Sequence, residues 1–246
     1  MSSGPQRRPA KGIECMSAAG LAVLGREVIA CRRCARLVRW REEVARVKVR
    51  RFADQTYWGK PIPGFGDPAA QLLLVGLAPA AHGGNRTGRM FTGDESGNWL
   101  FRALHAAGFA NQEASVDRGD GLALTDCYIT ATCRCAPPGN KLLPREVASC
   151  RPFLLRELGL LTRVRVVVGL GRVGFETALS SYRALGRITY RTKPAFAHGA
   201  RYDFDGMTLL ASFHPSQQNT YTGRLTRPML QRVFREARTI LARQAR

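Results

Sequence analysis

The sequence lacks long apolar runs and is poor in acidic residues. No apolar stretch approaches the roughly 20 residues that span a bilayer, and the opening MSSGPQRRPAKG lacks the apolar core of a secretory signal. We therefore expect a cytoplasmic protein. Asp and Glu total 18 against 38 Lys and Arg, giving a net charge of +20. This imbalance predicts a polyanionic partner, with nucleic acid as the first candidate, although charge alone does not name it.

The cysteine count argues against a disulfide framework, because seven is an odd number in a chain without an export signal. Cys31 and Cys34 form a C-x-x-C pair, whose turn presents two thiolates to one metal ion or cluster. Cys135 and Cys150 are the favoured further ligands, with Cys133 as an alternative. Spacing does not separate zinc from an iron–sulfur cluster, and zinc is slightly favoured because structural four-cysteine zinc sites are common. The two remaining cysteines are interpreted as a core thiol and a tail residue, Cys127 and Cys15.

The chain organises into a tail and one domain. Residues 1–20 are rich in Ser, Gly, Pro and Arg, which predicts a mobile basic tail, and residues 21–246 are expected to form a single domain. Four short apolar runs separated by helical patterns predict strands at Gln71 to Leu77, Leu122 to Thr130, Val164 to Val168 and Met207 to Ser212. This alternation predicts an α/β fold with a central four-stranded parallel sheet and helices on both faces.

Two loops at the carboxyl ends of the predicted strands are candidate site loops, because ligands of such sheets bind at that edge. GLAPAAHGGNRTGRMFTGD, from Gly76 to Asp94, follows the first strand, yet its first turn has no acid or base. HPSQQNTYTGRL follows the fourth strand, and its first residue, His214, can donate a hydrogen bond into a cleft. A lone histidine is more often structural, but the two loops and the PPGN turn all project to the same edge.

The segment GLGRVG, from Gly169 to Gly174, matches the dinucleotide-binding fingerprint only weakly. It follows the third strand rather than the first, and RITYRTKP stands where an acidic residue is expected. The glycines are better explained by a tight turn and close helix packing. A dinucleotide-dependent oxidoreductase is therefore a secondary hypothesis.

Taken together, these segments resemble the uracil-DNA glycosylase superfamily, in particular its iron–sulfur families four and five. PGFGDPAAQLLLVGLAPAAHGGNRTGRMFTGD resembles the first motif of family five with its lead-in strand, and HPSQQNTYTGRL resembles the last motif. CRRC, CAPPGN and ASCRP match the ligand-bearing segments. The resemblance extends from Cys31 to the final helix.

The resemblance implies a DNA repair enzyme with a structural cofactor. It implies a four-iron, four-sulfur cluster rather than zinc, bound by Cys31, Cys34, Cys135 and Cys150. It also implies a monofunctional glycosylase that hydrolyses the N-glycosidic bond of a base flipped out of DNA, which initiates base excision repair. A nucleoid-associated monomer is expected. The principal alternative is a non-catalytic, zinc-bearing nucleic-acid-binding protein.

Several site residues follow from the resemblance. His214 matches the histidine that hydrogen-bonds the pyrimidine O2, and Phe91 matches the aromatic residue that stacks on the flipped base. Further base-binding positions are Gly76, Leu77, Ala78, Pro79 and Ala131, and the loop that contacts DNA is expected to use Ser216, Asn219 and Arg224.

Two departures from related families shape the expected chemistry. YITA replaces the YITN of family four, so Ala131 stands where an asparagine would bind the uracil edge. We therefore expect a range broader than uracil, including hypoxanthine and ethenocytosine. The GLAP turn supplies no water-activating group, so Asn85 is the candidate that positions water, with His82 and Asp94 behind it. An amide is not a strong base, which leaves most of the catalysis to His214 and the DNA phosphates.

Overall fold

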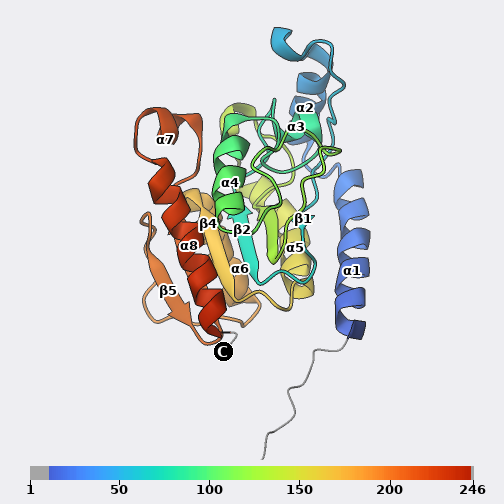
Figure 1. Cartoon of the computed structure of the whole chain (residues 1–246). Helices are drawn as coiled ribbons and strands as arrows, with labels where there is room; N and C mark the ends of the chain where they lie inside the picture. Colours follow the sequence, from blue (N-terminus) through green and yellow to red (C-terminus); the bar gives the residue numbers. More distant parts are fainter. Residues whose placement is uncertain (1–10, 245–246) are drawn as a thin grey trace, which may run out of the picture.

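A central parallel sheet organises the molecule (Figure 1). The computed structural model describes the backbone of residues 11–244 and the side chains of residues 17–243. Within this part of the chain, six strands form one sheet in the order β1-β3-β2-β4-β6-β5. The strands are β1 (Phe65–Gly66), β2 (Leu72–Gly76), β3 (Cys127–Ala131), β4 (Val166–Leu170), β5 (Arg201–Phe204) and β6 (Met207–Ser212).

The four central strands, β3, β2, β4 and β6, are parallel to their neighbours, which confirms the predicted core of the sheet. Their residues are all buried, as continuous apolar runs such as LLLVG and VVVGL require when helices cover both faces. The sheet is mixed rather than purely parallel, because β1 and β5 add antiparallel edges. These two strands were not predicted, since one has two residues and the other alternates exposed and half-buried residues.

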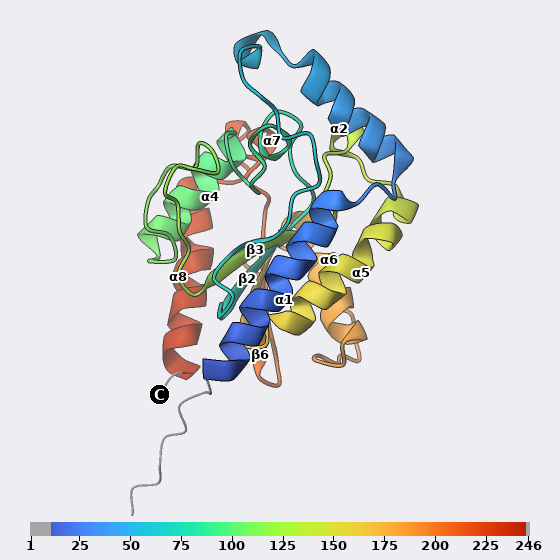
Figure 2. The same ribbon diagram turned by 90° about the vertical axis from the view of Figure 1, so that its right-hand side faces the viewer.

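Helices cover both faces of the sheet (Figure 2). The α-helices are α1 (Lys11–Ala30), α2 (Ala35–Val47), α3 (Gly84–Thr87), α4 (Glu95–Ala106), α5 (Pro144–Leu160), α6 (Gly171–Ala184), α7 (Gln217–Tyr221) and α8 (Arg227–Gln244); two short 3-10 helices are η1 (Arg50–Phe52) and η2 (Pro138–Asn140). Helices α4 and α8 pack on one face, and α5 and α6 pack on the other with α1 outside α5. None of the described helices is long and apolar enough to cross a bilayer.

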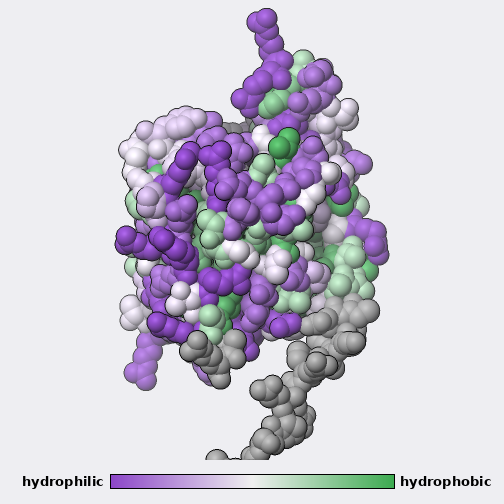
Figure 3. Space-filling model, in the orientation of Figure 1, coloured by the Kyte–Doolittle hydropathy of each residue, from purple (hydrophilic) through white to green (hydrophobic). Residues whose placement is uncertain are grey.

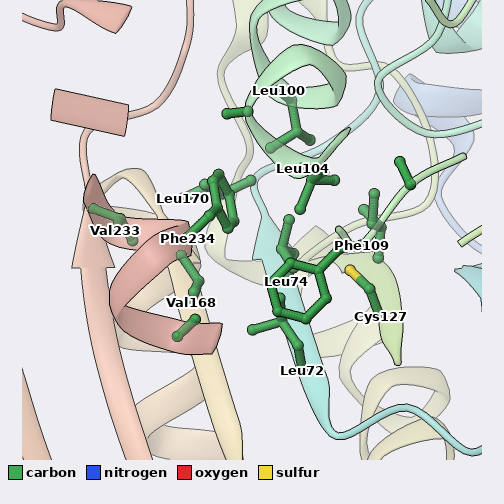
Figure 4. Packing of buried hydrophobic residues seen from close by; sticks show 14 of the residues in the cluster. Leu72, Leu74, Leu100, Leu104, Phe109, Cys127, Val168, Leu170, Val233 and Phe234 are labelled. Atoms are coloured by element: carbon green, nitrogen blue, oxygen red, sulfur yellow. The ribbon is translucent and has the colours of Figure 1, made fainter. Parts of the chain in front are cut away.

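The core on the α4 and α8 side is built from apolar side chains of alternate strand positions (Figure 4). Leu72 and Leu74 face Leu100 of α4 and Phe234 of α8, and all four are fully buried or nearly so. Cys127 belongs to this cluster, which confirms its interpretation as a core thiol, and burial raises the pKa of its thiol far above the ordinary value. The outer surface visible in Figure 3 is largely hydrophilic, in keeping with the excess of arginine.

The prediction of a basic tail over residues 1–20 is wrong for its second half. Residues 1–10 lie outside the described part of the chain, whereas residues 11–20 form the first half of α1, so the prediction of a tail up to residue 20 is wrong for that segment. The spacing of Ser17, Leu21, Leu24 and Val28 places these buried residues on one face of a helix. The Ser17 hydroxyl donates a hydrogen bond to the carbonyl of Leu160 at 2.9 Å, which attaches the helix to α5.

The GLGRVG segment forms the tight junction between β4 and α6. A Cβ atom at Gly174 would lie 2.1 Å from the carbonyl oxygen of Val75, so only glycine lets α6 approach β2 this closely. These contacts agree with the prediction that the glycines serve helix packing, and they bring the start of α6 beside the end of β6.

Candidate active site and cysteine cavity

A pocket opens at the carboxyl edge of the central strands. Its walls come from the end of β2, the loop that follows β2, the start of α4, the end of β3 and His214 after β6. The lining residues are Gly76, Ala78, Pro79, Ala80, Met90, Phe91, Asp94, Ser96, Ala131 and His214. Six predicted base-binding residues therefore meet in one pocket. Leu77 is not among the lining residues, and its carbonyl accepts a hydrogen bond from the amide of Cys133 at 3.0 Å.

Two rings form the most distinctive part of the pocket wall. The Phe91 and His214 rings have centroids 5.6 Å apart and are tilted by 31°. Phe91 has a φ of 52°, in the left-handed region that non-glycine residues rarely adopt, so the surrounding loop must hold it there. Gly76 leaves room for the ring, because a Cβ atom at that position would lie 3.1 Å from the Phe91 Cζ atom.

A buried arginine braces the loop beside Phe91. The Arg89 guanidinium, 5% exposed, donates two hydrogen bonds to Asp120 at 2.8 and 2.6 Å. It also donates to the hydroxyls of Thr92 and Ser115, both at 2.9 Å. Although burial opposes it, hydrogen bonds from Arg89 and from backbone amides lower the pKa of Asp120 to about 2. The ion pair therefore ties the loop carrying Phe91 to the segment before β3.

His214 is neutral at physiological pH. Burial lowers its pKa to about 4, because an apolar wall disfavours the imidazolium form. A neutral imidazole keeps one N–H donor, so the ring remains able to donate one hydrogen bond. Two neighbours hold the backbone here: the Asn219 amide donates to the His214 carbonyl at 2.8 Å, and a Cβ atom at Gly171 would lie 3.2 Å from the His214 Cβ atom.

Asn85 is not brought to the pocket wall. Its side chain is 1% exposed, and its Nδ2 donates a hydrogen bond to the carbonyl of Arg41 in α2 at 3.1 Å. Its Oδ1 has no hydrogen-bond partner among the described residues. The sequence predicted that Asn85 contacts the water and that Asp94 lies behind it. In the structure the order is reversed, because Asp94 lines the pocket and Asn85 does not.

Asp94 is the carboxylate on the pocket wall. It caps α4, where its Oδ1 accepts a hydrogen bond from the Gly97 amide at 3.0 Å, and burial raises the pKa of its carboxyl group. The sequence does contain a signal for this position, because an aspartate directly before an amphipathic helix is a preferred N-cap. Ser96, two residues further on, adds a hydroxyl to the same wall.

A wider cleft adjoins the pocket and shares Ala80, Asp94 and Ser96 with it. Its other walls come from α2, η1, the PPGN turn and the start of α7, and include Trp40, Arg51, His82, Pro137, Asn140, Ser216, Gln217 and Gln218. The ring nitrogen Nδ1 of His82 lies 3.0 Å from the Tyr57 hydroxyl.

The three residues predicted to contact DNA occupy different places. Ser216 lines the wider cleft, Asn219 holds the His214 backbone, and the Arg224 guanidinium lies over the Phe213 ring at 4.6 Å. The sequence reasoning did not single out Tyr221, which ends α7 with 74% of its surface exposed.

A second, largely apolar cavity brings together the cysteines. Cys31 and Cys34 come from the corner between α1 and α2, Cys133 and Cys135 from the loop after β3, and Cys150 from α5, and all five line this cavity. Cys133 is fully buried, with its Sγ 3.6 Å from the carbonyl oxygen of Glu146. Within the described part of the chain, no group of three or more His, Cys, Asp or Glu side chains is arranged to hold a single metal ion.

The chemistry of the cavity wall fits an anionic, thiolate-bound group. Thiolates are the ligands that iron–sulfur clusters and structural zinc use in proteins. Two buried arginines, Arg41 and Arg134, also line the cavity, and the Arg41 Nη1 donates a hydrogen bond to the Cys135 Sγ at 3.0 Å. Three of their guanidinium nitrogens have no partner among the described residues. Such buried donors are costly unless something accepts their hydrogen bonds.

Comparison with known proteins gives one consistent family. The model of the uracil DNA glycosylase superfamily matches residues 63–238. The chain is 50% identical to a type-5 uracil-DNA glycosylase of Mycobacterium bovis over 225 residues, which is 91% of this chain and 82% of the relative. It is 50% identical to the type-5 enzyme of Thermus thermophilus over 86% of this chain and 94% of the relative, and 45% identical to that of Pyrobaculum aerophilum over 85% and 88%.

Proposed function

Because the chain belongs to the uracil-DNA glycosylase superfamily, we propose that it hydrolyses the N-glycosidic bond between uracil and deoxyribose in DNA. The observation that carries this proposal is the pocket in which Phe91 and His214 face the same space. The reaction releases the free base, leaves an abasic site and starts base excision repair. The surplus of positive charge supports DNA as the substrate.

The pocket suits a flipped pyrimidine. The Phe91 ring offers a stacking surface, while the small residues Gly76, Ala78 and Ala131 leave room opposite it. The neutral His214 donates a hydrogen bond to the pyrimidine O2, where negative charge develops as the bond to the sugar breaks. A neutral donor suits this task, because the apolar wall that keeps the imidazole uncharged also strengthens the hydrogen bond.

Water reaches the sugar from the side of the wider cleft. Asp94 lies on the wall shared by the cleft and the pocket, so we assign it the positioning of the attacking water in place of Asn85. Asp94→Asn tests this assignment with little structural damage, since asparagine caps helices as well as aspartate does. We expect a slower excision step with DNA binding retained, and wild-type rates in this variant would remove the Asp94 charge from the mechanism.

A substrate range broader than uracil is supported by the wall at Ala131. This residue is 1% exposed and presents only a methyl group at the end of β3, so no side-chain amide reads the base edge there. We infer that hypoxanthine and ethenocytosine are also removed. Strict uracil specificity on a panel of modified oligonucleotides would contradict this inference.

The DNA strand lies in the wider cleft. Ser216, at the start of α7, and Arg51 line it, and the exposed Tyr221 stands at the end of the same short helix, where an aromatic side chain can contact unstacked bases. The expected nucleoid-associated monomer stays a prediction.

A four-iron, four-sulfur cluster is the cofactor that we propose for the cysteine cavity, held by Cys31, Cys34, Cys135 and Cys150. When bound, it supplies cross-links between the corner of α1 and α2, the loop after β3 and α5, and it takes no part in bond cleavage. Zinc is the alternative. Iron and inorganic sulfide in the purified protein support the cluster, whereas zinc alone would contradict it.

The decisive test of function is incubation of the purified protein with a uracil-containing oligonucleotide, followed by alkali to cut at abasic sites. We expect cleavage at the uracil position, and a strong loss in His214→Ala. A protein that binds DNA but releases no base would favour the non-catalytic, zinc-bearing binding protein.

A further inference from the structure

Two fully buried arginines line the cysteine cavity. Arg41 and Arg134 are each 2% exposed, although arginine is almost never buried to this degree unless it is paired. Both line the cavity together with the cysteines. They come from different parts of the fold, since Arg41 lies in α2 and Arg134 lies between Cys133 and Cys135.

Among the described residues, the charge of Arg41 has no buried counterion. Its Nη1 donates to the Cys135 Sγ at 3.0 Å, and both terminal nitrogens lie 3.4 Å from the carbonyl oxygen of Cys31. The nearest carboxylate, Glu42, is 3.7 Å away, 43% exposed and already engaged by both terminal nitrogens of Arg32. The closest contacts of the Arg41 guanidinium are therefore with two of the proposed cluster ligands, and its Nε has no partner in the described part of the chain.

Only some of the hydrogen-bond donors of Arg134 have a partner among the described residues. Its Nη2 pairs with Glu157 at 2.5 Å, and Glu157 also accepts hydrogen bonds from the hydroxyls of Tyr128 and Thr130. Its Nε and Nη1 have no partner among the described residues. The Glu157 carboxylate thus offsets the charge of Arg134 but leaves two of its donors free for another acceptor.

These observations point to a negatively charged acceptor inside the cavity. A cluster ligated by four thiolates is an anion, and its sulfur atoms accept N–H hydrogen bonds. Hydrogen bonds to sulfur and nearby positive charge are among the factors that set the reduction potential of such clusters. Both factors stabilise the reduced form, because reduction adds negative charge.

We propose that Arg41 and Arg134 donate hydrogen bonds to the sulfur atoms of the bound cluster and thereby raise its reduction potential. This inference rests on the cofactor proposed above. Arg41 is the better residue to test, because replacing Arg134 would also leave the Glu157 carboxylate buried without its counterion.

The test compares Arg41→Gln with Arg46→Gln. Arg46 lies on the same helix and pairs only with the exposed Glu43, so its removal leaves no buried carboxylate, and it does not line the cavity. The holoproteins are titrated with a chemical reductant, and the cluster is followed by electron paramagnetic resonance. We expect a more negative midpoint potential in Arg41→Gln and a wild-type potential in Arg46→Gln.

Resonance Raman spectra provide a second readout. Exchange of the wild-type holoprotein into D2O should shift the iron–sulfur stretching bands, because N–H···S bonds become N–D···S bonds, and the shift should be smaller in Arg41→Gln. Arg41→Lys keeps the charge but lacks the planar fork, so its potential should lie between those of wild type and Arg41→Gln.

The possible failures are distinguishable. Absence of iron and sulfide from the wild-type protein would refute the cofactor, whatever the arginines do. A loaded Arg41→Gln protein with wild-type potential and a wild-type D2O shift would refute the inference alone. If Arg41→Gln folds, as judged by circular dichroism, but loses its cluster while Arg46→Gln retains it, the role of Arg41 at the cluster is supported.

Discussion

The burial of His214 couples the charge state of the active site to the stability of the fold. Its pKa is lowered to about 4 in the folded protein, whereas an unfolded chain exposes the imidazole and lets it titrate near 6.5. Between these two values the unfolded chain binds a proton that the folded protein does not bind. The contribution of His214 to stability is therefore complete above pH 6.5 and is lost as the pH falls toward 4.

The size of this effect follows from the two pKa values. The gap corresponds to at most about 3 kcal/mol, and because His214 is partly exposed at the pocket we expect about 2 kcal/mol. In a domain whose total stability is on the order of 10 kcal/mol, such a change is readily measurable.

Urea unfolding of the wild type and of His214→Gln, at several pH values from 7 to 4, measures the effect. Glutamine does not titrate in this range, so the wild type should lose about 2 kcal/mol more than the variant as the pH falls. An NMR titration of the four histidines checks directly whether the pKa of His214 is lowered. Excision rates should likewise show no ionisation of His214 near pH 6.5.

Two results would refute the reasoning. A His214 imidazole that titrates between pH 6 and 7 would mean that the pocket does not desolvate it. Parallel stability curves for wild type and His214→Gln would mean that its protonation is not linked to folding.

Three further substitutions test other parts of the site. Asn85→Ala should slow excision without abolishing DNA binding, since it loosens the pocket loop from α2; wild-type rates in a single-turnover assay would show that the contact between Asn85 and α2 does not support the pocket. Asp120→Asn leaves Arg89 buried without its counterion and should lower the free energy of unfolding, measured in urea, by roughly 3 kcal/mol. An unchanged urea midpoint would show that the Arg89–Asp120 ion pair does not stabilise the loop. Ala131→Asn should raise the ratio of uracil to hypoxanthine excision about tenfold or more, and an unchanged ratio would show that this wall does not set base choice.

Much of the fold could be predicted from the sequence, because the central strands are buried on both faces and therefore appear as continuous apolar runs. The second strand was placed too early: residues 122–126 precede β3, although Leu122 and Leu124 are buried in the same core. Apolar residues that pack from a loop cannot be told from a strand by hydrophobicity alone. The edge strand β5 was missed because it carries little apolar signal.

Sequence reasoning found the site residues whose positions depend on strand ends and local motifs. It missed those whose positions depend on contacts between distant parts of the chain. Phe91, Ala131 and His214 follow from strand ends and motif resemblance, and they meet in one pocket. The burial of Asn85 depends on its contact with α2, some 40 residues earlier in the chain, which no local pattern reveals. The same is true of Arg41, whose contact with Cys135 spans 94 positions.

Helix α2 serves two sites with one residue. The Arg41 side chain reaches into the cysteine cavity, while its backbone carbonyl holds Asn85 under the loop that walls the base pocket. The geometry of both sites therefore depends on the position of this one residue. A disturbance that shifts α2, such as oxidative damage at the cysteines, would be transmitted to the loop that receives the base, so an enzyme damaged there would be impaired at the base pocket as well.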